Sequence, residues 1–214
     1  MTYLQLINGV LSRLREDTVS SVTESNYSTL ISSLVNDAKR LVEDAWQWSH
    51  LRTEIDVVTA PDTLEYSLTG AGNNFTIDFV SIPVYNVFLS QRDNRWLRKQ
   101  RFNTTATGLP STYVNTGVDA NGDMTVGLWI KPDAAYTVTF EGWQRQSDLS
   151  SEDDVLTVPS QPVLLLAVAL AARERGEVGG QTAAELFGIA QQSLGDAIAH
   201  DAAKNEYDND WYVQ

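Results

Sequence analysis

The hydrophobic period changes twice along this chain, and that change limits the folds open to it. Near both ends, apolar residues recur every three or four positions, as on one face of a helix, whereas between about residues 51 and 143 they alternate with polar ones, as on a strand. Packing the helices of the two ends together is the economical way to bury their apolar faces. The pattern therefore predicts an α+β protein in which strands are inserted into a helical bundle.

Four helices are expected, at residues 2–15, 26–48, 163–172 and from 182 to about 201. Thr2 is placed to cap the first helix, since a hydroxyl can accept a hydrogen bond from the first turn. Pro159 and Pro162 are tolerable only in the first turn of the third helix. Residues 163–172 are apolar on every side, which is typical of a helix at the centre of a bundle.

Seven strand-like runs follow the second helix, punctuated by Gly, Asn, Asp and Pro, at residues 51–57, 64–68, 75–80, 84–89, 95–102, 124–130 and 136–143. Short strands at this spacing favour an antiparallel β-sandwich or barrel. We therefore expect an antiparallel helical bundle from residues 1–50 and 158–202, an inserted β domain at 51–157, and a short extended C-terminal tail at 203–214.

The chain is acidic, with 15 Lys+Arg against 28 Asp+Glu and a formal net charge of −13. This charge repels phosphates and anionic membranes and disfavours sequence-specific DNA binding, although it would suit a channel wall past which DNA slides. The chain has no cysteine, so disulfides are excluded. Its longest apolar run, residues 162–172, is too short to span a bilayer, and nothing resembles a signal peptide. We expect a protein made in the cytoplasm.

No catalytic or metal-binding motif stands out. His50 and His200 come without a nucleophile motif, so we expect surface or interface histidines. With no Cys and no spaced His pair, neither a zinc site nor a cofactor is predicted. The spacing of Asp119, Asn121 and Asp123 does not fit a calcium loop, and Asn121-Gly122 is typical of a tight hairpin turn.

A local excess of positive charge interrupts the acidic chain. A third of all Lys+Arg lie within ten positions, at Arg92, Arg95, Arg98, Lys99 and Arg101. Two interpretations are equally good: one solvated face of a strand, or a docking site for an acidic neighbour.

Most of the six tryptophans are expected to lie in the core, and Trp211 is the exception. With Tyr207 and Tyr212 it lies in a tail too polar to bury itself, and aromatic residues are what interfaces use as anchors. We expect the tail to become ordered on a partner; the alternative is a tail without function.

The layout also carries a family resemblance. The segments AKRLV, WQW and LAARERG, at residues 38–42, 46–48 and 170–176, together with the turn into a strand bearing Tyr66, resemble the portal-to-tail adaptor family of short-tailed bacteriophages, including its tail tubular protein A branch. A helix rich in Ala and Gln, ending near Asp201, is similar to that family's closing hairpin.

The resemblance implies a structural subunit of the virion tail or neck, assembled in the host cytoplasm, with no catalytic site. It would form a ring, twelvefold in the family, between the portal and the tail nozzle, through which DNA passes without sequence-specific binding. The helical bundle would face the portal and the β domain the nozzle. The tail with Tyr207, Trp211 and Tyr212 would dock on the portal.

Two other functions fit the residues. A β-sandwich module could bind a receptor or a glycan through Trp96, Trp129 or Trp143 as stacking platforms. A peptidoglycan hydrolase could use an Asp/Glu pair, although acidic residues are too abundant here for any pair to stand out.

Overall fold

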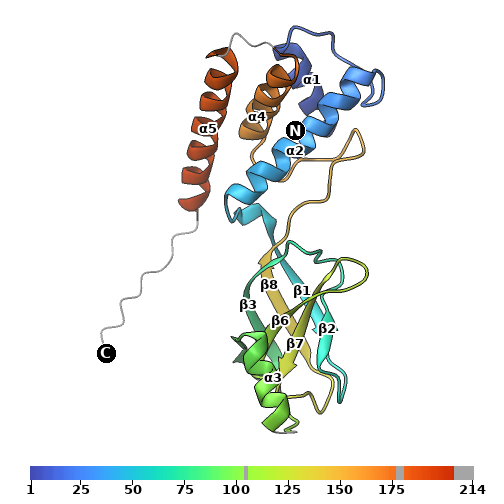
Figure 1. Cartoon of the computed structure of the whole chain (residues 1–214), viewed down its shortest axis with the longest axis vertical. Coiled ribbons are helices and arrows are strands. Elements are labelled where there is room, and N and C mark those ends of the chain that lie inside the picture. Colours follow the sequence, from blue (N-terminus) through green and yellow to red (C-terminus); the bar gives the residue numbers. More distant parts are fainter. Residues whose placement is uncertain (104–105, 177–180, 205–214) are drawn as a thin grey trace, which may run out of the picture. The chain divides into compact units, whose positions relative to one another are not determined.

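A computed structural model of the chain describes residues 1–103, 106–176 and 181–204 (Figure 1). It confirms an α+β protein with helices at both ends of the chain and strands between them. The chain divides into two compact units. The helical unit comprises Met1–Leu51 and the residues from Gln146 onward, and the β unit comprises Arg52–Arg145.

The helical unit is built around one central helix. Its helices are α1 (Tyr3–Arg13), α2 (Asn26–Ala45), α4 (Ser160–Glu174) and α5 (Gln181–Ala202). Helix α4 contacts α1, α2 and α5 and is buried almost continuously from Pro162 to Ala172, as its all-round apolar sequence predicts. Pro162 lies in the first turn, where the missing N–H costs nothing. Within the described ranges, no helix is both long and apolar enough to cross a membrane.

Hydroxyl side chains fix where the first two helices begin. Thr2 accepts a hydrogen bond from the Gln5 N–H at 3.3 Å, and Ser25 accepts one from the Ser28 N–H at 2.9 Å. In each case the side chain three residues later bonds back to the capping residue, which completes a capping box. The predicted cap at Thr2 is confirmed.

The segment after the last strand belongs to the helical unit, although the sequence placed the boundary near residue 157. Asn36 holds Leu149 in two hydrogen bonds, to its N–H and its carbonyl oxygen, each 3.0 Å long. Arg40 forms a bidentate pair with Asp148, and the Tyr3 N–H donates to the Asp154 carbonyl oxygen at 2.8 Å. These bonds fasten residues 146–154 to α1 and α2.

A charged pair lies inside this unit. Lys39 and Glu43 have fully buried side chains and form an ion pair at 3.1 Å, one helical turn apart on α2. The Lys39 ammonium also donates to the Gln146 carbonyl oxygen at 2.6 Å. Burying two charges is costly unless each finds partners, and Lys39 finds both the Glu43 carboxylate and the Gln146 carbonyl oxygen.

The β unit contains two four-stranded sheets. The first has the order β1-β8-β3-β4, with strands Arg52–Val58, Thr137–Trp143, Thr76–Ile82 and Val87–Phe88. The second has the order β2-β7-β6-β5, with strands Glu65–Ser67, Met124–Trp129, Thr112–Val118 and Ser90–Gln91. The expectation of wholly antiparallel pairing is wrong at one place, because β5 and β6 run parallel. The described strands form no closed barrel.

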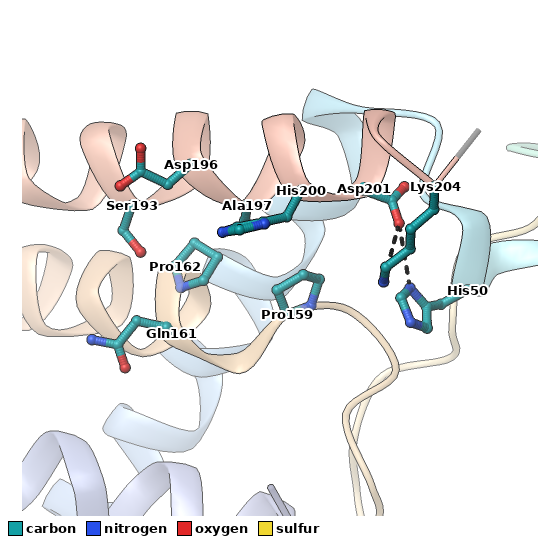
Figure 2. A pocket seen from close by; sticks show the side chains of 10 residues that line it. All are labelled: His50, Pro159, Gln161, Pro162, Ser193, Asp196, Ala197, His200, Asp201 and Lys204. Carbon is teal, nitrogen blue, oxygen red and sulfur yellow. Dashed lines mark ion pairs between the residues drawn. The ribbon is translucent and has the colours of Figure 1, made fainter. Parts of the chain in front are cut away.

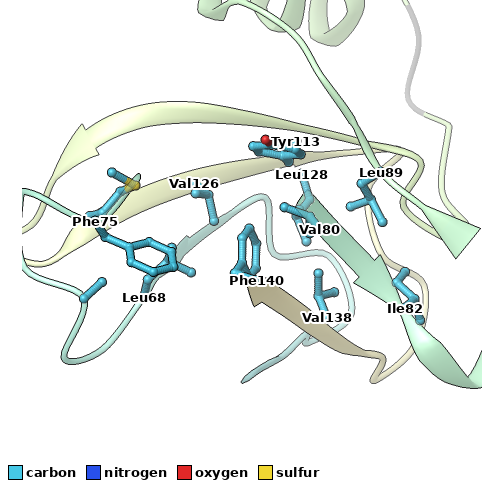
Figure 3. Packing of buried hydrophobic residues seen from close by; sticks show 12 residues of the cluster. Leu68, Phe75, Val80, Ile82, Leu89, Tyr113, Val126, Leu128, Val138 and Phe140 are labelled. Carbon is cyan, nitrogen blue, oxygen red and sulfur yellow. The ribbon is translucent and has the colours of Figure 1, made fainter. Parts of the chain in front are cut away.

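One hydrophobic core joins the two sheets. Its buried members come from both sheets and from the loops: Leu68, Ala71, Phe75, Val80, Ile82, Leu89, Tyr113, Met124, Val126, Leu128, Val138 and Phe140. Figure 3 shows Phe140 and Val138 on one strand facing Val126 and Leu128 on another, and Tyr113 and Phe140 meet edge to face with ring centres 6.1 Å apart. This core is what the period-two pattern predicted.

Two strand predictions need correction, and the sequence missed one of the longer strands. Residues 95–102 form a helix, α3 (Asn94–Asn103). Residues 84–89 begin with a 3₁₀ turn, Pro83–Tyr85, before the short strand β4. Strand β6 was not predicted, because Asn115 and Gly117 interrupt its alternation, and its register shifts at that point.

The Asn121-Gly122 hairpin turn is confirmed between β6 and β7. Gly122 has φ of 90°, which favours glycine, and Asp119 organises the loop. The Asp119 carboxylate accepts hydrogen bonds from the Ser67 hydroxyl at 2.8 Å and from the N–H groups of Asn121 and Asp123. These bonds lower the pKa of Asp119, with the Ser67 hydroxyl contributing most. The carboxylate therefore holds the turn together.

We expect Gly142→Ala to destabilise the β unit. A Cβ on Gly142 in β8 would fall far inside van der Waals contact with the Thr76 carbonyl oxygen and 3.0 Å from Phe75 Cζ. Strand β3 would have to move, so the free energy of unfolding should fall by about 1–3 kcal/mol or more in a denaturant titration. Gly195→Ala is the control: its Cβ meets nothing within 4 Å and should stabilise α5 by roughly 0.5–1 kcal/mol.

Lys39→Met should lower the free energy of unfolding by about 3–5 kcal/mol, because it removes the cation that balances the buried Glu43 carboxylate. The double variant Lys39→Met/Glu43→Leu should lose less than the sum of the two single variants, since neither charge then remains. Denaturant titration of all four proteins measures the coupling. Simple additivity would contradict the assigned role of this pair.

Candidate interaction surfaces

Helix α3 carries the basic run of the sequence. Its first turn is capped by Asp93, whose carboxylate accepts a hydrogen bond from the Trp96 N–H at 2.5 Å. Leu97 is fully buried against Val114 and Trp129. Gly127 in β7 makes room for this contact, because a Cβ there would lie 2.8 Å from Leu97 Cδ2. The helix is therefore packed closely against the second sheet.

The outward side of α3 is cationic. We define the basic face as Arg92, Arg95, Arg98 and Lys99, all of them exposed. Arg92 lies over the Trp96 ring at 6.0 Å from its centre, and Phe102 beside them is 93% exposed. Among the described residues, none of these four cations forms an ion pair. Arg95, Arg98 and Lys99 thus lie on one side of a helix, with Arg92 just before its first turn. Of the two interpretations, the strand face is wrong, and the docking site stays a prediction.

Arg101 differs from its neighbours. It is half-buried and pairs with Glu65 at 3.1 Å, while its Nε and second terminal nitrogen are buried without a hydrogen-bond partner in the described structure. That second nitrogen would lie 3.3 Å from a Cβ at Gly127. Arg101 therefore covers the seam between α3 and β7, whereas the other four cations face outward.

A pocket of about 380 Å³ lies in the helical unit, between the first turn of α4 and the last turns of α5. Figure 2 shows Pro159, Pro162 and His200 around it, with His50 and Asp201 at one end. Both histidines of the chain therefore line the same pocket. No sequence signal joins them, because they lie 150 positions apart and are brought together by the packing of the helices.

Asp201 is the buried anchor of this pocket. Its carboxylate accepts hydrogen bonds from the Ser49 hydroxyl at 2.6 Å and the Ser49 N–H at 2.9 Å, and His50 Nδ1 lies 3.8 Å away. Burial alone would raise the pKa of Asp201, but the Ser49 bonds, with smaller contributions from His50 and Lys204, hold it below its usual value. The C-terminal end of α5 is thereby tied to the 3₁₀ turn at Ser49–Leu51.

This arrangement is not a catalytic triad. The Ser49 hydroxyl donates directly to the Asp201 carboxylate, whereas a triad needs the histidine between the two. His50 Nδ1 lies 3.5 Å from Ser49 Oγ and has no hydrogen bond to Asp201. Over the described ranges there is also no group of three or more His, Asp or Glu side chains that could hold a metal ion.

The acidic loop after β8 offers no obvious hydrolytic pair either. The Asp154 carboxylate accepts from the Ser150 and Ser151 N–H groups, both at 2.7 Å, and Asp148 is engaged by Arg40. These bonds lower the pKa of both carboxyl groups, with the Ser150 N–H and Arg40 respectively contributing most. Both carboxylates therefore shape the loop.

The tryptophans proposed as glycan platforms are largely occupied. Trp129 is buried beside Leu97, and Trp96 packs on the same cluster beneath Arg92. Trp143 is half-buried, with the Arg52 guanidinium 5.8 Å from its ring centre. The predicted tail anchors Tyr207, Trp211 and Tyr212 lie outside the described residues.

The family model of the SU10 adaptor proteins matches residues 1–212, which is nearly the whole chain. The chain belongs to the SU10 adaptor protein family. No curated protein matches it. The resemblance found in the sequence is thereby confirmed: this is a phage head–tail adaptor, a structural protein of the virion from a family that is not enzymatic. An adaptor binds other virion proteins, so the surfaces that matter are those open to partners.

We expect the adaptor to depend on the Asp201 carboxylate for stability at neutral pH. Because its pKa is lowered on folding, its contribution is present above the unfolded pKa of about 4 and is lost as the pH falls through the folded value. Asp201→Asn should therefore lower the Tm at neutral pH. On acidification the Tm of this variant should fall by less than the Tm of the unsubstituted protein. Asp196→Asn, an exposed carboxylate in the same pocket, is the control and should change little.

Proposed function

We propose that this adaptor forms a ring between the portal and the tail nozzle, extends the DNA channel, and gives tail proteins a surface on which to dock. The observation that carries the proposal is the family match over residues 1–212. Following the resemblance, the ring is twelvefold, with the helical unit toward the portal and the β unit toward the nozzle.

The division into two units supports this role. A closed ring needs heterologous contacts, in which each copy offers two different surfaces to its neighbours. Two surfaces of opposite charge are candidates for these contacts: the basic face of α3 in the β unit, and the helical unit, which holds most of the acidic residues. A formal charge of −13 also keeps phosphates from adhering, so DNA can pass without being bound.

The basic face is proposed as the docking site for an acidic virion protein surface. Arg92, Arg95, Arg98 and Lys99 repel one another, and an acidic partner would relieve that repulsion at the interface. The segment with Tyr207, Trp211 and Tyr212 is proposed as a second contact, since aromatic side chains in a polar segment become buried only against a partner.

Electron microscopy of the purified adaptor mixed with its portal protein tests this function. We expect a ring of extra density that continues the portal axis. When a nozzle protein is added, further density should appear on the side of the ring away from the portal. The matched sample is the portal alone, which should show no added density. Portal particles without added density, beside free adaptor, would overturn the proposal.

A further inference from the structure

The basic face of α3 needs an anionic partner of a particular shape. Arg95, Arg98 and Lys99 lie three and four residues apart on α3, Arg92 lies just before its first turn, and Trp96 and the exposed Phe102 lie close by in the sequence. Between Asn94 and Asn103 there is no acidic residue. A fitting partner is therefore a short strip in which negative charges alternate with aromatic side chains.

The chain itself contains such a strip. Residues 205–214 read NEYDNDWYVQ, with acidic side chains at Glu206, Asp208 and Asp210 and no cation among them. The three acids recur at every second residue. Tyr207 follows the first of them, and Trp211 and Tyr212 follow the last. Ten residues can span up to about 35 Å, which exceeds the length of α3, about 15 Å at 1.5 Å per residue.

We infer that residues 205–214 of one adaptor bind the basic face of α3 on a second copy. The contact rests on the proposed ring, in which a segment of one subunit meets a different surface of the next. Charge complementarity supports it: three carboxylates meet the four cations of the basic face, and Trp211 or Tyr212 packs beside Trp96 and Phe102. The resemblance assigns this segment to the portal, so the portal is the competing partner.

Zero-length cross-linking of the intact chain tests this contact directly. A carbodiimide joins a carboxylate to a lysine amine only when the two touch. The chain has four lysines: Lys39, Lys99, Lys131 and Lys204. Lys99 is part of the basic face, whereas Lys39 is buried with Glu43 and Lys131 pairs with Asp62 at 2.7 Å. Lys131, in the same unit, is the internal control.

Equal amounts of ¹⁴N- and ¹⁵N-labelled adaptor are mixed at millimolar concentration and low salt, cross-linked, digested, and analysed by mass spectrometry. We expect peptides that join Lys99 to Glu206, Asp208 or Asp210 and that combine the two labels, with none from Lys131 to the same acids. The yield should fall to background in high salt, because exposed charges are then screened.

A matched pair of variants separates recognition from total charge. Arg95→Glu/Arg98→Glu keeps Lys99 as the reactive amine yet reverses the face, so the mixed-label cross-link should disappear. Arg13→Glu/Arg15→Glu changes the net charge by the same amount, but on exposed residues of the helical unit. The mixed-label cross-link should persist in this variant. Circular dichroism of each variant checks that it is folded.

Three results would overturn the inference: Lys99 cross-links that never combine the two labels, cross-links that survive Arg95→Glu/Arg98→Glu, or no Lys99 cross-link to residues 206–210. If added portal captures the segment instead, the portal is its partner. Microscopy of the portal complex keeps the two proposals distinct. A ring without the Lys99 cross-link leaves the proposed function standing and removes only this contact, whereas a missing ring removes the function itself.

Discussion

Helix α4 has no polar side, and the architecture of the chain depends on covering it. From Pro162 to Ala172 nearly every residue is buried, which requires neighbours all around the helix. Helices α1 and α2 come from the start of the chain and α5 from its end. Burying α4 therefore joins the two ends of the chain into one unit, and the residues between must leave that unit and return to it. The insertion of the β unit is a consequence of this requirement.

Some of the polar bonds of the helical unit lie at the two points where the chain leaves it and returns to it. At the exit, Ser49 is bound by the buried Asp201 at the end of α5. At the return, α2 holds Gln146 through Lys39 and Leu149 through Asn36. Buried polar groups contribute specificity only when they are satisfied, and here they are satisfied by the connecting segments. The helices thus fix both ends of the β unit's connections.

The helices were predictable because their apolar period is long and continuous, and the hairpin at Asn121-Gly122 because only a few turn geometries suit that pair. Helix α3 was not. Its single buried anchor, Leu97, sets no period, and Trp96 beside it makes the run look alternating. The missed signals were Asp93, three residues before Trp96, and the uniformly helix-favouring Arg, Leu, Lys and Gln that follow. The pocket that brings His50 and His200 together depends on tertiary packing alone.

The construction of α3 separates what holds the helix from what the helix presents. Leu97, the space left by Gly127 and the Arg101–Glu65 pair attach it to the second sheet, whereas Arg95, Arg98 and Lys99 take no part in that packing. Charges on the outer side can therefore change with little effect on the fold, since exposed substitutions typically alter stability by less than about 0.5 kcal/mol. The packing therefore fixes the position of the surface, while substitutions on its outer side can change its charge and with it the affinity for an anionic partner.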